Sequence, residues 1–197
     1  MHSIIIPCSR REQVCFSWCI PSLLHALELA QPYQAEILIM MDHPLTVERY
    51  CGPNVHFITP PLTIHRKGKQ SFNKSRLLND GLSLTSGDLI TFLDCDAIVG
   101  PAFFRAHARR KWERLKRLCF RVRYIDVGMS RPDDVQPWQI FDYALAQMKT
   151  RPERIAFEAY PHPNKDARAR NNPIGIPWGN SQFTARRDAL GDLRYDE

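Results

Sequence analysis

The chain has 197 residues, of which 44% are hydrophobic and 24% charged, an ordinary balance for a globular domain that excludes a largely disordered chain. Its length suits one domain with a sizeable core. The formal net charge of +6 favours anionic partners such as nucleotides, nucleic acid or an acidic lipid surface, without choosing among them. No apolar run approaches the roughly 20 residues that span a bilayer, so any membrane contact is expected to be peripheral.

The six cysteines form no CxxC pair, and no secretory signal peptide precedes them. We therefore expect reduced thiols in a cytoplasmic protein. Cys15 and Cys19 lie one helical turn apart with His25 nearby. A zinc site needs more convergent ligands than these, so packing is the expected role of both cysteines.

The first 41 residues predict strand, helix and strand. Ser3–Ile6 is a β-branched apolar run stopped by Pro7, which indicates a buried strand at the centre of a sheet. Gln13–Ala30 has apolar residues at helical spacing, and Pro21 either kinks this helix or lies in the first turn of its second half. Glu36–Met41 is the next strand. This order implies a right-handed parallel crossover.

A third short strand and a second helix follow. Val55–Ile58 is the strand, and after it residues 63–71 form a polar, basic loop. Phe72–Leu84 has the apolar spacing of a helix. Lys74 and Arg76 lie near the start of that helix, where cations are unfavourable with respect to the helix dipole unless an anion is also present.

Two acids end the next apolar run, Leu89–Leu93. Because side chains alternate along a strand, Asp94 and Asp96 are expected to lie side by side at its end, where α/β sheets bind ligands. Adjacent carboxylates repel unless a cation lies between them, and a hard divalent cation leaves positions open for phosphate oxygens. The pattern indicates a metal site for a phosphorylated substrate; the alternative is a polar strand end whose acids cap the next turn.

A basic segment follows these acids. Ala102–Leu118 is predicted as one helix, with seven lysines and arginines between Arg105 and Arg117 against the single acid Glu113. It is either a solvated face or a peripheral docking surface for anionic lipid or a polyanionic acceptor. Only Trp112 could stack on a base there, so we expect no nucleic-acid partner.

The rest of the chain is less regular. Cys119–Ile125 alternates like a strand, and residues 126–177 form a long connection with one helical piece, Trp138–Met148. Such connections often carry specificity. Trp178–Asp188 predicts a final strand, in which Gly179 permits close approach of a ligand.

Several of these segments occur together in one known family. The ordered set resembles the nucleotide-sugar-binding domain of a glycosyltransferase family 2 enzyme with a GT-A fold, in particular the branch of polymerising and galactosyl-type hexosyltransferases that serve polysaccharide biosynthesis. The matching segments are Ile4–Pro7, Glu36–Asp42, Phe72–Gly81, Ser86–Asp88, Asp94–Asp96 and Gly179–Asp188.

The resemblance covers most of residues 3–100 and 178–197. It implies an α/β fold with a mostly parallel, Rossmann-like central sheet flanked by helices. One domain, 1–197, would comprise a nucleotide-sugar-binding half, 1–100, and an incomplete acceptor-side half, 101–197.

The resemblance also implies roles for residues of the first half. Pro7 would contribute to nucleotide-sugar binding, and Asp42 would hydrogen-bond the base or ribose. Lys74 and Arg76 would lie near the nucleotide or its diphosphate. Each has a plainer alternative, since Asp42 could cap a turn and Lys74 could be solvated.

By the same resemblance, Asp94 and Asp96 would form the metal motif. Asp96 would bind Mn²⁺ or Mg²⁺ directly, and Asp94 would hold the ribose or a metal-bound water. Gly179 and Asn180 would border the donor sugar.

The implied activity is an inverting, metal-dependent transfer of a sugar from a nucleoside diphosphate donor, with UDP expected as the carrier, to a glycan or lipid-linked acceptor. Charge on the departing phosphate would be stabilised by the cation at Asp94 and Asp96, aided by Lys74 or Arg76. A base must also deprotonate the acceptor hydroxyl.

The sequence departs from the family at its end. Family members supply the base from an acidic pair that follows a motif resembling Tyr195–Glu197, and the chain stops at Glu197. Gly191–Arg194 replaces the family's tandem glycine. We therefore expect a C-terminally truncated transferase with an unassigned base; the alternative is a non-catalytic remnant that binds sugar nucleotides.

Overall fold

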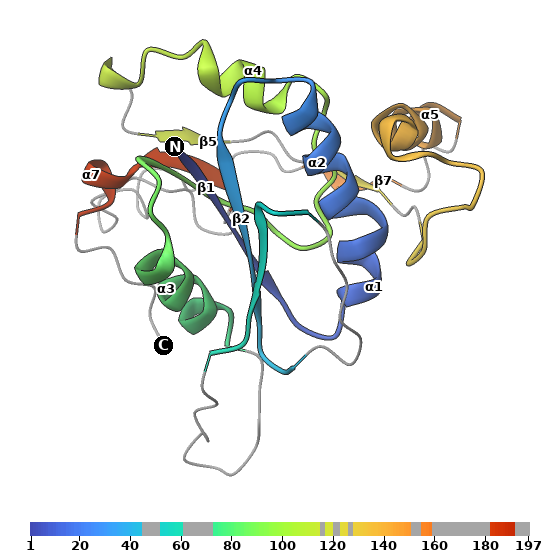
Figure 1. The fold of residues 1–197 in the computed structure, drawn as a ribbon. Helices are drawn as coiled ribbons and strands as arrows, with labels where there is room; N and C mark the ends of the chain where they lie inside the picture. Colours follow the sequence, from blue (N-terminus) through green and yellow to red (C-terminus); the bar gives the residue numbers. More distant parts are fainter. Residues whose placement is uncertain are drawn as a thin grey trace.

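The computed structural model describes residues 1–44, 52–60, 73–114, 117–119, 123–125, 128–150, 155–158 and 182–191 (Figure 1). The predicted loop 63–71, Gly179, Asn180 and Tyr195–Glu197 lie outside these ranges. The strands are β1 (His2–Cys8), β2 (Ala35–Met41), β3 (Val55–Ile58), β4 (Leu89–Phe92), β5 (Arg117–Cys119), β6 (Arg123–Ile125), β7 (Ile155–Glu158) and β8 (Phe183–Arg186). The helical segments are α1 (Glu12–Val14), η1 (Cys15–Cys19), α2 (Ile20–Glu28), α3 (Lys74–Leu84), α4 (Phe103–Ala108), η2 (Trp112–Arg114), η3 (Pro137–Gln139), α5 (Ile140–Thr150) and α7 (Arg187–Leu190).

Within the described ranges, the main sheet has six strands in the order β3-β2-β1-β4-β8-β5. The pairs among β1 to β4 are parallel, whereas β8 is antiparallel to both β4 and β5. β6 and β7 form a separate antiparallel pair. The fold is therefore α/β with a mostly parallel sheet, and β1 occupies its centre, as predicted.

β1 is also the point where the order of the strands reverses. The chain moves from β1 to β2 on one side of it and returns to β4 on the other. The backbone N–H of Leu93 donates to the carbonyl of Ile5 at 3.0 Å, so Ile5 and Pro7 direct their backbone groups toward β4. β4 has ended at Phe92, so the missing N–H of Pro7 breaks no bond of the sheet. β1 therefore continues past the predicted stop at Pro7 to Cys8.

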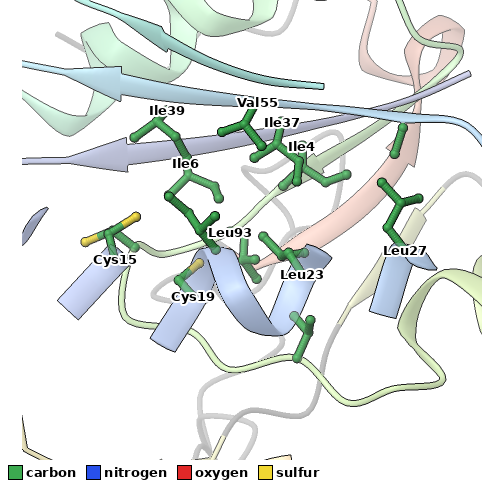
Figure 2. Packing of buried hydrophobic residues seen from close by; sticks show 14 of the residues in the cluster. Ile4, Ile6, Cys15, Cys19, Leu23, Leu27, Ile37, Ile39, Val55 and Leu93 are labelled. Atoms are coloured by element: carbon green, nitrogen blue, oxygen red, sulfur yellow. The ribbon is translucent and has the colours of Figure 1, made fainter. Parts of the chain in front are cut away.

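Alternation along β1 and β2 sends apolar side chains to both faces of the sheet. Ile4, Ile6, Ile37 and Ile39 pack against η1 and α2 on one face (Figure 2). Ile5, Leu38 and Met40 pack against α3 on the other. Figure 1 shows α1 and α2 on one side of β1 and β2, with α3 on the other. Parallel strands that are covered on both faces read as continuous apolar runs, as these do in the sequence.

The first helix contains a π-helical turn. The backbone N–H of Ile20 donates to the carbonyl of Cys15, five residues earlier, and Pro21 follows within the first turn of α2. A proline cannot make the regular i to i−4 bond, and the wider turn before it accommodates that gap. This outcome agrees with the second of the two predicted places for Pro21.

Three predicted elements differ from the structure. The basic helix predicted over Ala102–Leu118 ends at Ala108, and the chain then forms η2 and β5. The single strand predicted over Cys119–Ile125 is wrong, because β5 and β6 belong to different sheets. The last strand is confined to Phe183–Arg186 within the described part of the predicted range.

Other predictions hold closely. β3 has the predicted bounds, α3 begins two residues after the predicted start, and η3 with α5 covers the predicted piece Trp138–Met148. Among the described helices, none is both long and apolar enough to cross a bilayer.

Candidate functional site

The carboxyl ends of β1, β2 and β4 lie at one edge of the sheet because the three strands are parallel. Ligands of open α/β sheets bind at this edge, where the strand order reverses. The segments that emerge there are 9–11 after β1, 42–43 after β2 and 93–96 after β4. These three segments, with Glu12, Lys74 and Gln182, form the candidate site.

Asp94 and Asp96 lie in a turn rather than in the strand itself. β4 ends at Phe92, and the N–H of Ala97 donates to the carbonyl of Asp94 at 3.0 Å. Asp94 is half-buried, Cys95 is buried and Asp96 is exposed. The strand-based account of their geometry is therefore wrong in detail, although the two acids do lie at the predicted edge.

Asp94 is held from two sides. Its Oδ1 pairs with Nζ of Lys74, and its Oδ2 accepts a hydrogen bond from Nε2 of Gln182 at 3.0 Å. Lys74 is the first residue of α3, so Asp94 supplies the anion that makes a cation acceptable at this helix start. The structure brings together the predicted residues Lys74 and Asp94.

Asp96 pairs with a residue to which the sequence assigned no role. Nη1 of Arg11 lies 2.6 Å from Oδ2 of Asp96, and both side chains are largely solvent-accessible. A signal for Arg11 was present, because it lies in the polar loop directly after β1, at the edge where ligands bind. Gln182 was missed too, although it lies in the final matching segment.

Asp42 is engaged on both carboxylate oxygens. Ser9 Oγ donates to Oδ2 at 2.5 Å, and Nδ1 of His43 lies 2.5 Å from Oδ1. Nε2 of His43 in turn faces Oε1 of Glu12. The hydrogen bond with Asp42 and the charge of Glu12 raise the pKa of His43 above its usual value, and this outweighs the lowering effect of burial.

The other predicted residues take different places. Arg76 forms an ion pair with Asp80 on its own helix at 3.4 Å, and its backbone N–H donates to the Oδ1 of the capping residue Asn73 at 2.9 Å. Pro7 is buried within β1. Gly179 and Asn180 lie outside the described residues, and their assignment stays a prediction.

Four buried cysteines lie beside and beneath these acids. Cys8 ends β1, Cys15 and Cys19 belong to η1, and Cys95 lies between the two aspartates. All four are free thiols. Thiol hydrogen bonds, with burial, raise the pKa of Cys8, Cys15 and Cys95. The four buried side chains pack beneath the turn, and Cys19 Sγ lies 3.8 Å from the Asp94 carbonyl oxygen.

The donor set suits a hard divalent cation in part. Asp94 and Asp96 offer carboxylate oxygens, which Mg²⁺ and Mn²⁺ prefer. Within the described ranges, no group of three or more histidine, cysteine or acidic side chains could hold a metal ion. A cation at the two aspartates would therefore complete its shell with water and phosphate oxygens, as Mg²⁺ does at phosphate sites.

No protein-family model matches the sequence, and no curated protein matches it. Among solved structures, the chain is similar to a fragment of TarS from S. aureus, with 14% identity, a TM-score of 0.39, and coverage of 54% of this chain and 31% of that one. The same fragment in complex with UDP-GlcNAc gives 16% identity, a TM-score of 0.44, and coverage of 68% and 37%. The galactosyltransferase LgtC, in complex with donor and acceptor sugar analogues, gives 11% identity, a TM-score of 0.39, and coverage of 80% and 67%. This chain spans about a third of the length of those TarS chains, and at such low identities and TM-scores nothing about its chemistry follows from the likeness.

Proposed function

We propose that this protein is a glycosyltransferase that moves a sugar from a nucleoside diphosphate donor to an acceptor hydroxyl. The observation that carries the proposal is the pairing of acids and cations at the edge where the strand order reverses. Asp42 lies at the end of β2, and the pairs Lys74–Asp94 and Arg11–Asp96 lie beside the end of β4. This arrangement suits a ligand with a nucleoside at one end and a diphosphate at the other.

The cations have a chemical role in this proposal. Cleavage of the bond between the anomeric carbon and the diphosphate leaves negative charge on the departing phosphate. Lys74 and Arg11 are held at the site by Asp94 and Asp96, and each can turn from its carboxylate to a phosphate oxygen. A divalent cation at the two aspartates would supply Lewis-acid stabilisation of the same charge.

The finer parts of the proposal follow from the family resemblance. The donor carrier is UDP, the cation is Mn²⁺ or Mg²⁺, and the reaction inverts the anomeric centre. The acceptor is either a glycan or a lipid-linked molecule, and the protein acts in the cytoplasm. The basic segment around α4 and η2 would contact the membrane surface peripherally, through clustered charge rather than through one amphipathic helix.

Donor binding can be tested by thermal unfolding with UDP and Mn²⁺. A ligand at one hundred times its dissociation constant adds about 2.7 kcal/mol of stability, which raises Tm by roughly 5–10 °C for a chain of this size. We expect this rise for the unaltered protein and its loss in Asp96→Ala. Asp133→Ala, at an exposed acid in the loop before η3, should keep the full rise.

Transfer is a separate measurement. Release of UDP from UDP-sugars that depends on added glycan or lipid-linked acceptor supports the glycosyltransferase. Donor binding and slow hydrolysis without transfer to any acceptor would instead favour the non-catalytic sugar-nucleotide-binding module. No thermal stabilisation by any nucleoside diphosphate, with either cation, would contradict both.

A further inference from the structure

His43 lies between two carboxylates at the carboxyl end of β2. Its Nδ1 is 2.5 Å from Oδ1 of Asp42, and its Nε2 faces Oε1 of Glu12, the first residue of α1. The three side chains are between 22% and 33% exposed, so they are partly shielded from water yet open to a ligand. The histidine thus joins the end of β2 to the start of the first helix.

The two contacts define the charge of the ring. Carboxylate oxygens only accept hydrogen bonds, so each ring nitrogen that faces one must carry a proton. A neutral imidazole has a single N–H and would place a lone pair against either Asp42 or Glu12. The arrangement therefore requires an imidazolium, and the raised pKa of His43 agrees with this requirement.

The same contacts connect the two ends of the candidate site. Asp42 is held by His43 on one oxygen and by Ser9 on the other. Glu12 follows Arg11 in the chain, and Arg11 holds Asp96. A change at His43 is therefore transmitted both to the acid of β2 and to the loop that carries the cation beside Asp96.

We propose that His43 is a positioning residue, whose charged ring orients Asp42 toward the nucleoside part of the donor and orders the loop that contains Arg11. The inference rests on the proposed function. It gives a role to a histidine that no sequence motif marks, and it makes donor affinity depend on pH. As pH rises and His43 loses its proton, the ring keeps a single N–H and loses its hydrogen bond to either Asp42 or Glu12, so Asp42 is no longer tied through His43 to Glu12.

The test is UDP binding by calorimetry, with Mg²⁺, between pH 6.5 and pH 9. His43→Gln retains a polar side chain but carries no charge, and both of its N–H groups are on one nitrogen rather than on two nitrogens of a ring. We expect its dissociation constant for UDP to exceed the wild-type value about tenfold at pH 6.5 and to approach it at pH 9. The ionisation of UDP affects both dissociation constants equally, so it cancels in their ratio. His25→Gln, which alters a histidine on α2 outside this cluster, should keep the ratio near one throughout.

A second variant tests the charge argument independently. Glu12→Gln leaves His43 with one carboxylate, so the pH at which UDP affinity declines should move downward. A ratio that is independent of pH in His43→Gln, or an unchanged midpoint in Glu12→Gln, would overturn the inference while leaving the proposed function intact. Absence of UDP binding by the unaltered protein at every pH would overturn the proposed function itself.

Discussion

At the residue scale, two buried histidines define the direction of a hydrogen-bond chain at the end of the sheet opposite the candidate site. Nδ1 of His107 lies 2.7 Å from the carbonyl oxygen of Phe103, which only accepts, so Nδ1 carries the proton. Nε2 of His107 must then accept, and its partner at 2.8 Å is the hydroxyl of Thr184. A neutral His107 satisfies both contacts.

The chain of hydrogen bonds continues from Thr184, and each donor in it makes one hydrogen bond. Its oxygen accepts from the hydroxyl of Thr91 at 2.5 Å, and Thr91 accepts from Nε2 of His2 at 2.6 Å. Nδ1 of His2 then accepts from the hydroxyl of Tyr33 at 3.0 Å. Burial lowers the pKa of both histidines, so both stay neutral where the unfolded chain would begin to bind protons.

The unfolding free energy should therefore fall as the pH drops from 7 to 5. The unfolded histidines, with pKa near 6.5, take up protons that the folded ones do not, so stability is present above pH 6.5 and lost below it. Each histidine that stays neutral in the folded protein down to pH 5 lowers the unfolding free energy by about 2 kcal/mol over this range. His43 shifts in the opposite direction. Denaturant unfolding is therefore best measured in the His43→Gln background.

Two controls distinguish the contribution of these hydrogen-bonded histidines from the general effect of acid on stability. Nitrogen NMR should find the proton on Nδ1 of His107 and on Nε2 of His2. Thr184→Val deprives Thr91 of an acceptor and His107 of a donor, so it should lower the unfolding free energy by about 1–3 kcal/mol. Ser83→Ala, on the exposed surface of α3, should change the unfolding free energy little. An unfolding free energy that stays constant or increases as the pH falls from 7 to 5 would contradict the assignment of both histidines as neutral.

At the element scale, α3 approaches the sheet closely through one glycine. A Cβ added at Gly81 would lie 2.6 Å from Cγ2 of Ile5 and 3.1 Å from Cγ of Met40. The methyl group of Ile5 is attached to a branched, fully buried side chain and cannot turn away. The small residue therefore sets the distance between the helix that begins at Lys74 and the strands beneath it.

Gly81→Ala should destabilise the protein even though alanine favours helices. Overpacking against Ile5 costs about 1–3 kcal/mol, which exceeds the gain of roughly 1 kcal/mol in helix propensity. Urea unfolding with Ser83→Ala as the matched helix substitution measures the difference. An increase in stability on Gly81→Ala would show that α3 can move outward without cost.

The basic segment shows why local pattern failed for one element. Its charges continue the helical spacing past Ala108, but the indole N–H of Trp112 donates to the carbonyl of His107 at 3.0 Å and turns the chain. Arg117 then pairs with Ala185 of β8. Pairing with a strand that lies far away in the sequence overrides the local preference for helix.

At the scale of the whole molecule, the thiols are expected to be inert while the chain is folded. Cys8, Cys15, Cys19 and Cys95 are at most 8% exposed, and the raised pKa of Cys8, Cys15 and Cys95 leaves little thiolate to react. In the double variant Cys51→Ser/Cys119→Ser, which removes the cysteines whose side chains lie outside the described part, a thiol reagent should find no fast-reacting group.

The same reagent should count four thiols after unfolding in guanidinium, because the core that excludes it is then lost. The same measurement on wild-type protein shows how the two cysteines that the variant lacks react. Rapid reaction of even one thiol in the folded double variant would mean that the layer beneath the aspartates opens readily.

Much of the fold could be predicted because its signals are local. The apolar runs of β1, β2 and β4 and the spacing within α2 and α3 reflect burial on one or two faces, which the sequence displays directly. Lys74, Asp94 and Asp96 could be singled out because they follow a strand or begin a helix, whereas Asp42 was singled out by the family resemblance. The contacts of Arg11, Gln182 and His43 could not be predicted, since each has a partner that only the fold brings near.

By itself, the sequence determined the order of strands and helices in the first half and the acids at their ends, because periodicity and chain direction suffice for both. Only the tertiary structure decided which charged and polar side chains meet. Arg11 and Asp96 are 85 positions apart, and Gln182 and Asp94 are 88 apart. Contacts at such separations arise from the sheet order, which puts β1 between β2 and β4 and brings β8 beside β4. The spacing of residues along the chain does not reveal the strand order, because that order results from burying both faces of one sheet at once.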